Sequence, residues 1–355
     1  MNVRYLHSFL RSLMFVSVII PGILSAAAQF EREYELTVSS VLPRFESSPY
    51  VTEDWISEIG QLNTVDNKLD IVLPLWGANA LAYPNEVRSL RWSFRSDYLG
   101  MVFIDKQGRE SIASLDINAQ QINILVPAGY THISPISWSQ DSRRITFSAV
   151  GSDGIEQVML LSLPGLEIEA IAEGKLPTFS PESDRIAFLA PNDGVMLYTL
   201  EDKSEERQIP LEFPQATGLV WSGDGQAIAV THAANITTFD LETRIPHRIF
   251  DAFDYLAVEF QSGAATVRTY SASWSPDNQQ IAFVLNVRDE IVLGNVSQVL
   301  SVDITSGEVT EHLRRSFPFD PAEPSPADPR LFLSVSYQAR GAFIPSRDDD
   351  TSSDI

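Results

Sequence analysis

The stretch WSPDNQQIAF, residues 274–283, places a tight corner between two segments rich in apolar and aromatic residues. Pro276 restricts φ, while Asp277 and Asn278 favour turn conformations in which their side chains hydrogen-bond to the local backbone. The apolar run after the corner is typical of a strand buried on both faces. The ten residues therefore predict a β-hairpin whose first strand ends at Trp274.

The same pattern occurs four more times along the chain. The copies begin at Trp92, Trp138, Phe179, Trp221 and Trp274 and read WSFRSDYLGMVF, WSQDSRRITF, FSPESDRIAF, WSGDGQAIAV and WSPDNQQIAF. Each has an aromatic residue, a serine, a polar turn and an apolar triplet with a small middle member, and the first copy is interpreted as carrying two extra residues. Their starts are separated by 46, 41, 42 and 53 residues. Such a period, with a hairpin in every unit, indicates a β-propeller. Helical arrays have a similar period, but these units lack the apolar stripe with a 3.6-residue period that a helix would show.

Each unit continues as a propeller blade would. A third strand pattern follows the hairpin, as in residues 158–163, and a turn leads to a fourth, as in residues 308–313. Four short antiparallel strands form one blade of a propeller. The sequence therefore predicts an all-β fold.

The repeated Trp-Ser-Pro-Asp-Gly-x-x-Ile-Ala-Phe unit resembles the repeat of TolB-type β-propellers, which is also described as WD-like. The resemblance covers about residues 90–315, through the five copies quoted above. It implies the fold and says little about function, because the motif residues are structural. The chain departs from TolB before Trp92, where TolB carries an α/β domain and this sequence is short and strand-rich.

A ring of six four-stranded blades is predicted, with the last blade assembled from both ends of the chain. Residues 323–338, EPSPADPRLFLSVSYQ, are interpreted as a degenerate sixth copy with Leu331-Phe332-Leu333 as its apolar triplet. Strand candidates at 32–42 and 68–77 would complete this blade and remove an exposed edge. Seven blades, with the N-terminal residues forming a blade of their own, are the alternative.

These assignments divide the chain into a signal peptide over 1–28, a propeller domain over 29–345 and a disordered acidic tail over 346–355. Within the propeller, the closing strands lie in 29–87, the five motif-bearing blades in 88–315 and the degenerate last blade in 316–345. The longest interval contains extra residues at 252–270. An added hairpin, with Tyr255–Phe260 pairing with Ala265–Tyr270, is one interpretation, and extra length without a role is the alternative.

The N-terminus has the pattern of a secretory signal peptide. Arg4 and Arg11 precede an apolar core over residues 13–24, and Ala26-Ala27-Ala28 provides small residues before Gln29. The mature protein is therefore expected outside the cytoplasm, secreted or periplasmic, with no later membrane-spanning segment. An uncleaved anchor helix is the alternative. The chain has no cysteine, so its stability must come from a large core and not from disulfides.

The formal net charge of −22 argues against nucleic acid as a partner, because phosphate binding requires a basic face. No pattern typical of a catalytic, cofactor or metal site occurs either. Gly-x-Ser-x-Gly and His-Glu-x-x-His are missing, and the four histidines beyond the leader are scattered over three units. No catalytic residue, cofactor or metal is predicted, and paired carboxylates in the central funnel are kept as the enzyme alternative.

Structural roles are assigned to the aromatic and acidic residues of the motif. One aromatic per unit suits packing between blades, and the acidic residues suit caps of the turns. These residues are Trp92, Trp138, Phe179, Trp221, Trp274, Asp141, Asp224 and Asp277.

The predicted function is a secreted, non-enzymatic binding module for a protein, peptide or glycan, with a funnel-site hydrolase or lyase as the alternative. Loops that lead into each motif are expected on one face of the ring, where variable loops commonly bind ligands. The candidate contact residues on these loops are Tyr130, His132, Tyr255, Tyr270, Phe317 and Phe319.

Overall fold

A computed structural model describes the propeller strands and most of their connections. The described residues are 35–43, 55–64, 68–74, 86–105, 107–119, 121–191, 194–209, 213, 215–256, 265–289, 294–318 and 331–337. The predicted signal peptide over 1–28 and the predicted tail over 346–355 lie outside them. Within the described part, no helix is both long enough and apolar enough to cross a membrane.

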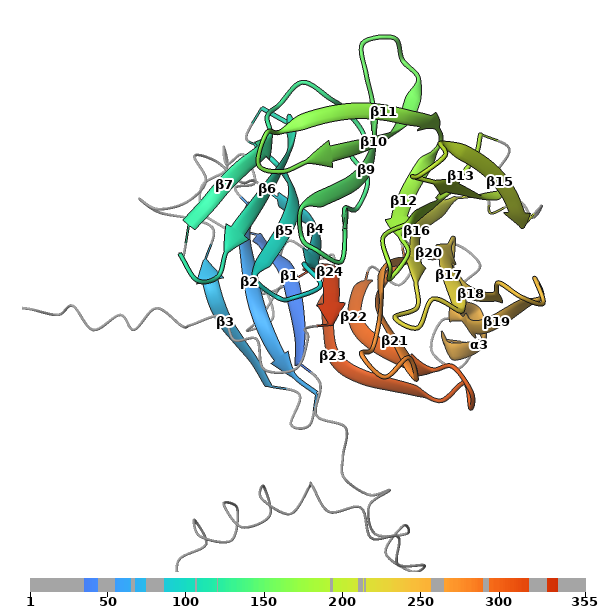
Figure 1. Cartoon of the computed structure of the whole chain (residues 1–355). Coiled ribbons are helices and arrows are strands. Elements are labelled where there is room, and N and C mark those ends of the chain that lie inside the picture. The colour runs from blue at the N-terminus through green and yellow to red at the C-terminus, as the bar shows by residue number, and fades with distance from the viewer. Residues whose placement is uncertain are drawn as a thin grey trace, which may run out of the picture. The chain divides into compact units, whose positions relative to one another are not determined.

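Six four-stranded antiparallel sheets form the ring, and each is one blade (Figure 1). Blade 1 contains β4 (Glu86–Trp92), β5 (Tyr98–Ile104), β6 (Glu110–Asp116) and β7 (Gln121–Val126). Blade 2 contains β8 (Ser137–Trp138), β9 (Arg144–Val150), β10 (Glu156–Ser162) and β11 (Glu167–Glu173). Blade 3 contains β12 (Lys175–Phe179), β13 (Arg185–Leu189), β14 (Val195–Thr199) and β15 (Ser204–Ile209).

The remaining blades continue the order of the chain and then close it. Blade 4 contains β16 (Ala216–Trp221), β17 (Ala227–His232), β18 (Asn235–Asp240) and β19 (Pro246–Asp251). Blade 5 contains β20 (Ala265–Trp274), β21 (Gln280–Asp289), β22 (Gly294–Asp303) and β23 (Val309–Pro318). Blade 6 contains β24 (Leu331–Tyr337), β1 (Glu35–Pro43), β2 (Trp55–Asn63) and β3 (Lys68–Pro74).

Blade 6 joins the two ends of the chain, as predicted. The red strand β24 pairs with the blue strand β1 in Figure 1, with Val335 opposite Val38 and Tyr337 opposite Leu36. The inner strands β24, β4, β8, β12, β16 and β20 follow one another around the ring, each beside the next. The prediction of six blades is confirmed, and the seven-blade alternative is wrong.

One detail of the sixth copy is corrected. Leu331-Phe332-Leu333 were expected to follow a corner, as the apolar triplet does in the other copies. They lie instead in the innermost strand, and Tyr337 pairs with Leu36 as Trp274 pairs with Ile281. The motif aromatic of blade 6 is therefore Tyr337, and its second strand is supplied by the N-terminal residues.

The repeated corner has one geometry in five blades. In blade 5, the Ser275 N–H donates to the Gln280 carbonyl and the Asn278 N–H donates to the Ser275 carbonyl, both at 2.9 Å. The fifth residue of each copy has a left-handed backbone, with φ between 56° and 74°, which favours glycine, asparagine and, at a cost, serine. These residues are Ser96, Ser142, Ser183, Gly225 and Asn278.

The first copy has a corner of the same length as the others, so the two extra residues predicted in it are wrong. The Ser93 N–H donates to the Tyr98 carbonyl, just as the Ser139 N–H donates to that of Arg144. Trp92 pairs with Leu99. The apolar triplet of this copy is therefore Leu99-Gly100-Met101, with glycine as its small middle member.

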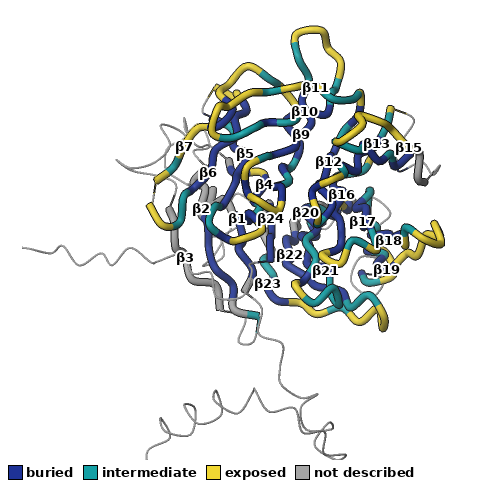
Figure 2. Tube along the Cα trace, in the orientation of Figure 1, coloured by how far each residue is buried: buried dark blue, intermediate teal, exposed yellow. Residues whose placement is uncertain are grey.

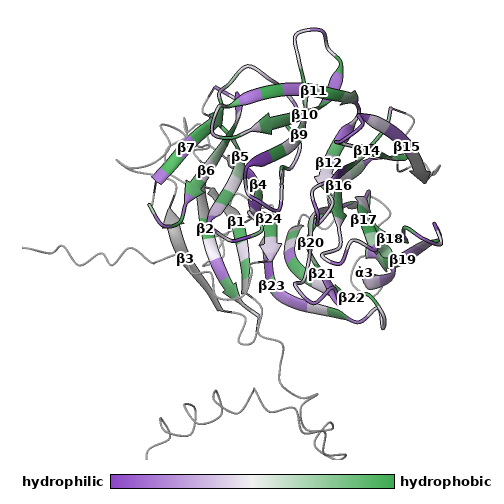
Figure 3. Ribbon diagram, in the orientation of Figure 1, coloured by the Kyte–Doolittle hydropathy of each residue, from purple (hydrophilic) through white to green (hydrophobic). Residues whose placement is uncertain are grey.

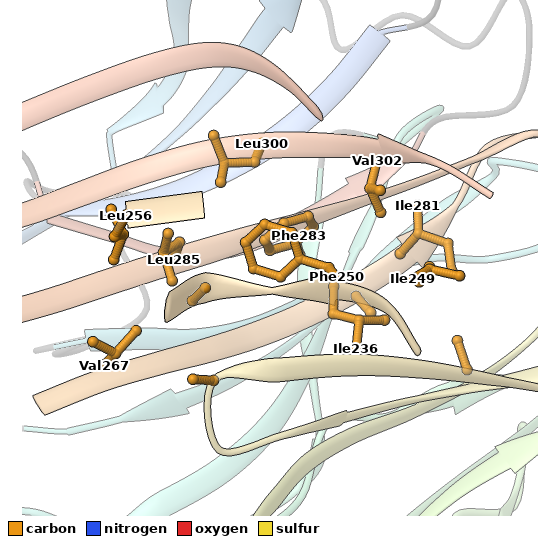
Figure 4. Close-up of a cluster of buried hydrophobic side chains, with 14 of the residues drawn as sticks. Ile236, Ile249, Phe250, Leu256, Val267, Ile281, Phe283, Leu285, Leu300 and Val302 are labelled. Atoms are coloured by element: carbon orange, nitrogen blue, oxygen red, sulfur yellow. The ribbon is translucent and has the colours of Figure 1, made fainter. Parts of the chain in front are cut away.

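The core lies between adjacent blades, and Figure 2 shows that the inner and middle strands of the blades are largely buried. Figure 3 shows apolar residues in the strands of every blade that it colours. Figure 4 shows the cluster between blades 4 and 5, in which Phe250 packs against Phe283 with ring centroids 4.6 Å apart. Ile236 and Leu285 in this cluster are fully buried. Removing such side chains from water supplies the main stabilisation of a ring without disulfides.

The predicted hairpin in the longest interval is wrong. Residues Ala252–Leu256 form a short helix, α3, and Ala265–Tyr270 pair with β21 as part of the inner strand β20. The Asp251 carboxylate accepts the backbone N–H of Phe253 at 2.9 Å. Asp251 thus caps the start of the helix. The aromatic residues of this segment favour a strand, which is why the sequence predicted a hairpin instead.

Candidate functional site

The two faces of the ring differ in the lengths of their connections. Each inner strand comes first in its blade, so the motif corner lies at one end and the segment from the previous blade arrives at the other. We call these the corner face and the connecting face. The segments that lead into the inner strands vary from the single residue Gly174 to residues 127–136 and 252–264. Binding residues commonly lie on such variable segments above a rigid scaffold.

Tyr130 and His132 lie in the segment between β7 and β8. Tyr130 is half-buried and packs edge-on against Phe147, with ring centroids 6.5 Å apart. His132 is exposed and has a φ of 56°, a strained conformation for a residue other than glycine. The exposed His132 is therefore better placed to meet a ligand than Tyr130.

Tyr255 belongs to a polar cluster between α3 and blade 5. Its hydroxyl lies 3.4 Å from Glu311 Oε2 and 3.4 Å from Gln298 Nε2. Gln298 also donates to Glu311, and its own Oε1 is buried without a partner in the described part. Burial, and then the Glu311 carboxylate, raise the pKa of Tyr255. This cluster holds α3 against blade 5.

The other aromatic candidates do not join a common site. Tyr270 is half-buried in β20 and packs against the core between blades 5 and 6. Phe317 belongs to the backbone of β23, but its side chain, like the whole of Phe319, lies outside the described residues. Among the described candidates, no ring contact or hydrogen bond joins one to another.

A small cavity lies on the ring axis. Its walls come from the inner strands of blades 1 to 4 and from the residues that precede β8, and its volume is about 20 Å³, room for one or two water molecules. The lining residues are Arg91, Pro135, Ile136, Ser137, Leu176, Pro177, Thr178, Gly218, Leu219 and Val220. Arg91 is the only charged residue among them.

The Arg91 guanidinium reaches from blade 1 across the axis to blades 5 and 6. Its Nη1 donates to the Leu90 and Val335 carbonyls, both at 3.2 Å, and its Nη2 donates to the Ala272 carbonyl at 2.7 Å. Burial lowers the pKa of Arg91 to about 10, far above neutrality, so the side chain remains a cation. No described carboxylate forms an ion pair with it.

Arg91 was not among the residues selected from the sequence. A signal for it existed, because it directly precedes the motif aromatic Trp92. The residues at the same place in the other copies are Ser137, Thr178, Val220 and Ser273, and Ser336 occupies the place before Tyr337. Aligning the copies at this position would have marked one arginine among small residues.

The motif aromatics lie between neighbouring blades. Trp138 stacks on Tyr98 of blade 1 at 5.8 Å, and its Nε1 donates to the Arg91 carbonyl at 3.1 Å. Trp274 Nε1 donates to the Val220 carbonyl of blade 4 at 3.3 Å. Trp92 donates to Thr37 of blade 6, Phe179 lies under Arg144 of blade 2, and Trp221 lies under Arg185 of blade 3. Each aromatic thus contacts the preceding blade, which fits a structural role.

The motif acids lie within their own corners. The hydroxyls of Ser139, Ser222 and Ser275 each donate at 2.6 Å to Asp141, Asp224 and Asp277 respectively. The Ser139 hydrogen bond is the main cause that lowers the pKa of Asp141. In blade 3 the acidic residue is Asp184, the sixth residue of its copy and not the fourth, and it accepts a hydrogen bond from the Ser180 hydroxyl at 2.7 Å. Among the described residues, no group of three or more histidines and carboxylates could hold a metal ion.

Comparison with known proteins gives the fold. No protein-family model matches the sequence, and no curated protein is similar enough in sequence to match. TolB from Acinetobacter baumannii superposes with a TM-score of 0.58 at 15% identity, over 85% of this chain and 66% of that one. A putative TolB from Agrobacterium tumefaciens gives 0.54 at 14%, over 87% and 100% of the two chains.

A third similar structure is a chain of a nidogen/laminin complex, with a TM-score of 0.53 at 9% identity, over 85% of this chain and 98% of that one. This chain spans less than two thirds of the Acinetobacter TolB. At these identities the likeness concerns architecture, and it agrees with the repeated motif and the six observed blades. The protein therefore has a TolB-like β-propeller fold.

Proposed function

We propose that this protein is an extracytoplasmic, non-enzymatic binding module that holds a protein partner on the connecting face. The observation that carries the proposal is the difference between the two faces. Five uniform corners occupy one face, whereas segments of unequal length, with exposed residues such as His132 and Phe253, occupy the other. A rigid ring with one variable face suits recognition of a large surface.

The comparisons support a protein partner over a peptide or glycan. One structure of similar fold comes from a complex between two proteins, nidogen and laminin. A funnel-site hydrolase or lyase would need room for a sugar ring or a peptide at the axis. The cavity between the described inner strands, at about 20 Å³, is smaller than either.

The location outside the cytoplasm rests on the N-terminal pattern. A basic start, a short apolar core and three alanines before Gln29 are typical of a cleaved signal peptide. Mass spectrometry of the exported protein should find Gln29 at or near the N-terminus. Recovery of intact Met1 in a membrane fraction would contradict the proposal.

The partner surface can be tested with two phenylalanines of similar exposure on opposite faces. Phe253 in α3 is 59% exposed on the connecting face, and Phe94 in the first motif corner is 56% exposed on the corner face. A photoreactive phenylalanine analogue at position 253 should cross-link a protein in the native cell envelope or medium, and the same analogue at position 94 should not.

The captured protein is then purified, and its affinity is measured by calorimetry. Phe253→Ala should weaken binding at least tenfold, while Phe94→Ala should leave it unchanged. Cross-linking from position 94 alone, or equal losses for the two variants, would show that the connecting face is not the binding surface.

A further inference from the structure

The cation on the ring axis has no counter-ion among the described residues, although the chain carries an excess of acidic residues. Of 47 aspartates and glutamates, none in the described part pairs with Arg91. The Arg91 side chain is partly buried, and withdrawing a charged group from water without a paired carboxylate is costly. The three carbonyls that accept from Arg91 satisfy its hydrogen bonds in part but do not neutralise its charge.

The position of Arg91 is special within the ring. The residue before the motif aromatic is small in the other five blades, and two of these residues bind the next blade. The Ser137 hydroxyl accepts the Phe179 N–H and the Ser273 hydroxyl accepts the Tyr337 N–H, both at 3.0 Å. Blade 1 replaces this bond with a guanidinium directed at the axis. The other blades pack without a long charged side chain at this position, two of them with a hydroxyl.

The guanidinium keeps donors for a ligand. Arginine has five N–H groups, and three of those of Arg91 donate to the carbonyls of Leu90, Val335 and Ala272. The Nε–H and the second hydrogen of Nη2 donate to no described residue. A planar guanidinium with two free N–H groups matches the two oxygens of a carboxylate.

The cavity beside Arg91 restricts the size of the ligand. Its volume of about 20 Å³ admits only a group of a few atoms. Its other walls include the apolar side chains of Pro135, Ile136, Leu176 and Leu219, which reduce the access of water and strengthen an ionic contact there. Both features favour a small carboxylate over a bulky or multiply charged anion.

We propose that the cavity on the ring axis is a binding site for a small carboxylate group, held by the free N–H groups of Arg91. The site does not depend on the partner surface described above. The carboxylate belongs either to a free acid, such as formate or acetate, or to an acidic side chain that enters the channel from another chain.

The test is calorimetric titration of the whole mature protein with sodium formate, exchanged for sodium chloride at constant ionic strength. Formate should bind with one site per chain, and benzoate should bind at least tenfold more weakly because it exceeds the cavity. Arg91→Met should abolish binding. Arg91→Lys should weaken it at least tenfold, since lysine lacks the planar pair of N–H donors that matches the two carboxylate oxygens. Arg143→Met, which removes an exposed arginine, is the control and should bind formate as the unchanged protein does.

A second measurement needs no variant, in case the ring fails to fold without Arg91. In the unchanged protein, nuclear magnetic resonance should show the Arg91 Nε–H signal, assigned through its contacts within β4, shifting with formate until saturation. Tighter binding of formate than of acetyl-aspartate amide would identify a free acid, and the reverse order would identify a side chain of a partner. No heat of binding and no Nε–H shift, or equal formate binding by Arg91→Met, would overturn the proposal.

Discussion

The backbone N–H of Gly223 in blade 4 donates to Asn278 Oδ1 in blade 5 at 2.7 Å, so two consecutive motif corners are bonded to each other. The Gln140 N–H donates in the same way to Ser183 Oγ at 2.6 Å, between blades 2 and 3. Both acceptors are the residue with a left-handed backbone in its corner. In blades 3 and 5, the fifth residue of the motif therefore shapes its own hairpin and also ties it to the preceding blade.

We expect Asn278→Ala to lower the free energy of unfolding by about 2 kcal/mol, from the lost hydrogen bond and from the left-handed backbone that alanine disfavours. Asn278→Gly keeps the conformation and loses only the acceptor, so its cost should be about 1 kcal/mol. Urea unfolding measures both values. Equal losses for the two variants would mean that the backbone conformation contributes nothing.

Gly100 has no room for a side chain. A Cβ atom at this position would lie 2.8 Å from Trp138 Nε1 and would also collide with the Ile136 side chain. Gly100→Ala should therefore cost about 1–3 kcal/mol through overpacking between blades 1 and 2. Thermal unfolding of Gly129→Ala is the control, because no atom lies within 4 Å of a Cβ there.

The collision can be confirmed with a second substitution. Ile136→Val removes the colliding methyl group, so the double variant Gly100→Ala/Ile136→Val should be more stable than the sum of the single effects implies. Strictly additive losses would show that Ile136 is not the obstacle.

The fold was predictable because its decisive signal is local. A corner of five residues between two strands is encoded by its own serine, acid and left-handed residue, and five copies fix the period. Strand β2 (Trp55–Asn63) was not foreseen, because its buried apolar residues Ile59 and Leu62 are three positions apart and do not show the two-residue alternation of a strand. Helix α3 was missed because its aromatic residues favour strands, whereas the cap from Asp251 decides the local structure.

The candidate site was less predictable, because it depends on which side chains the ring brings to its axis. Exposed aromatics in loops are reasonable ligand contacts from sequence alone, yet Tyr130 packs on Phe147 and Tyr255 binds Glu311. The environment of Arg91 comes from Ala272 and Val335, which are distant in sequence. No local pattern encodes such a convergence, and only the comparison of equivalent positions in the repeat indicates it.

Stability should decrease as the pH falls through the range in which unfolded histidine titrates. His312 is buried, with its Nε2 2.9 Å from the Ser301 hydroxyl, and burial lowers its pKa. Its folded pKa therefore lies below the unfolded value of about 6.5, and the unfolded chain binds the proton more tightly. The stabilisation is full above that pH and is lost as the pH falls below it. Burial lowers the pKa of His232 as well.

Urea unfolding between about pH 7.5 and pH 5.5 tests this effect, whose slope for one histidine is at most about 1.4 kcal/mol per pH unit. His312→Gln should flatten the pH dependence, whatever its cost at neutral pH. His247→Gln, at an exposed position, should leave the slope unchanged. An unchanged slope in His312→Gln would refute the assignment.

Ring closure can be tested by a cross-link, because the chain has no cysteine of its own. Val38 in β1 lies directly opposite Val335 in β24. Facing residues of antiparallel strands have Cα atoms about 4.5–5.5 Å apart, which suits a disulfide. Val38→Cys/Val335→Cys should therefore oxidise readily and raise the free energy of unfolding by about 2–5 kcal/mol, because the bond restricts nearly the whole unfolded propeller. Val38→Cys/Phe332→Cys is the matched control, since Phe332 pairs with Ser40 and not with Val38, and it should not form the bond without loss of stability. Efficient oxidation of the control pair, or failure of the Val38 and Val335 pair under the same conditions, would show that β24 does not close the ring in this register.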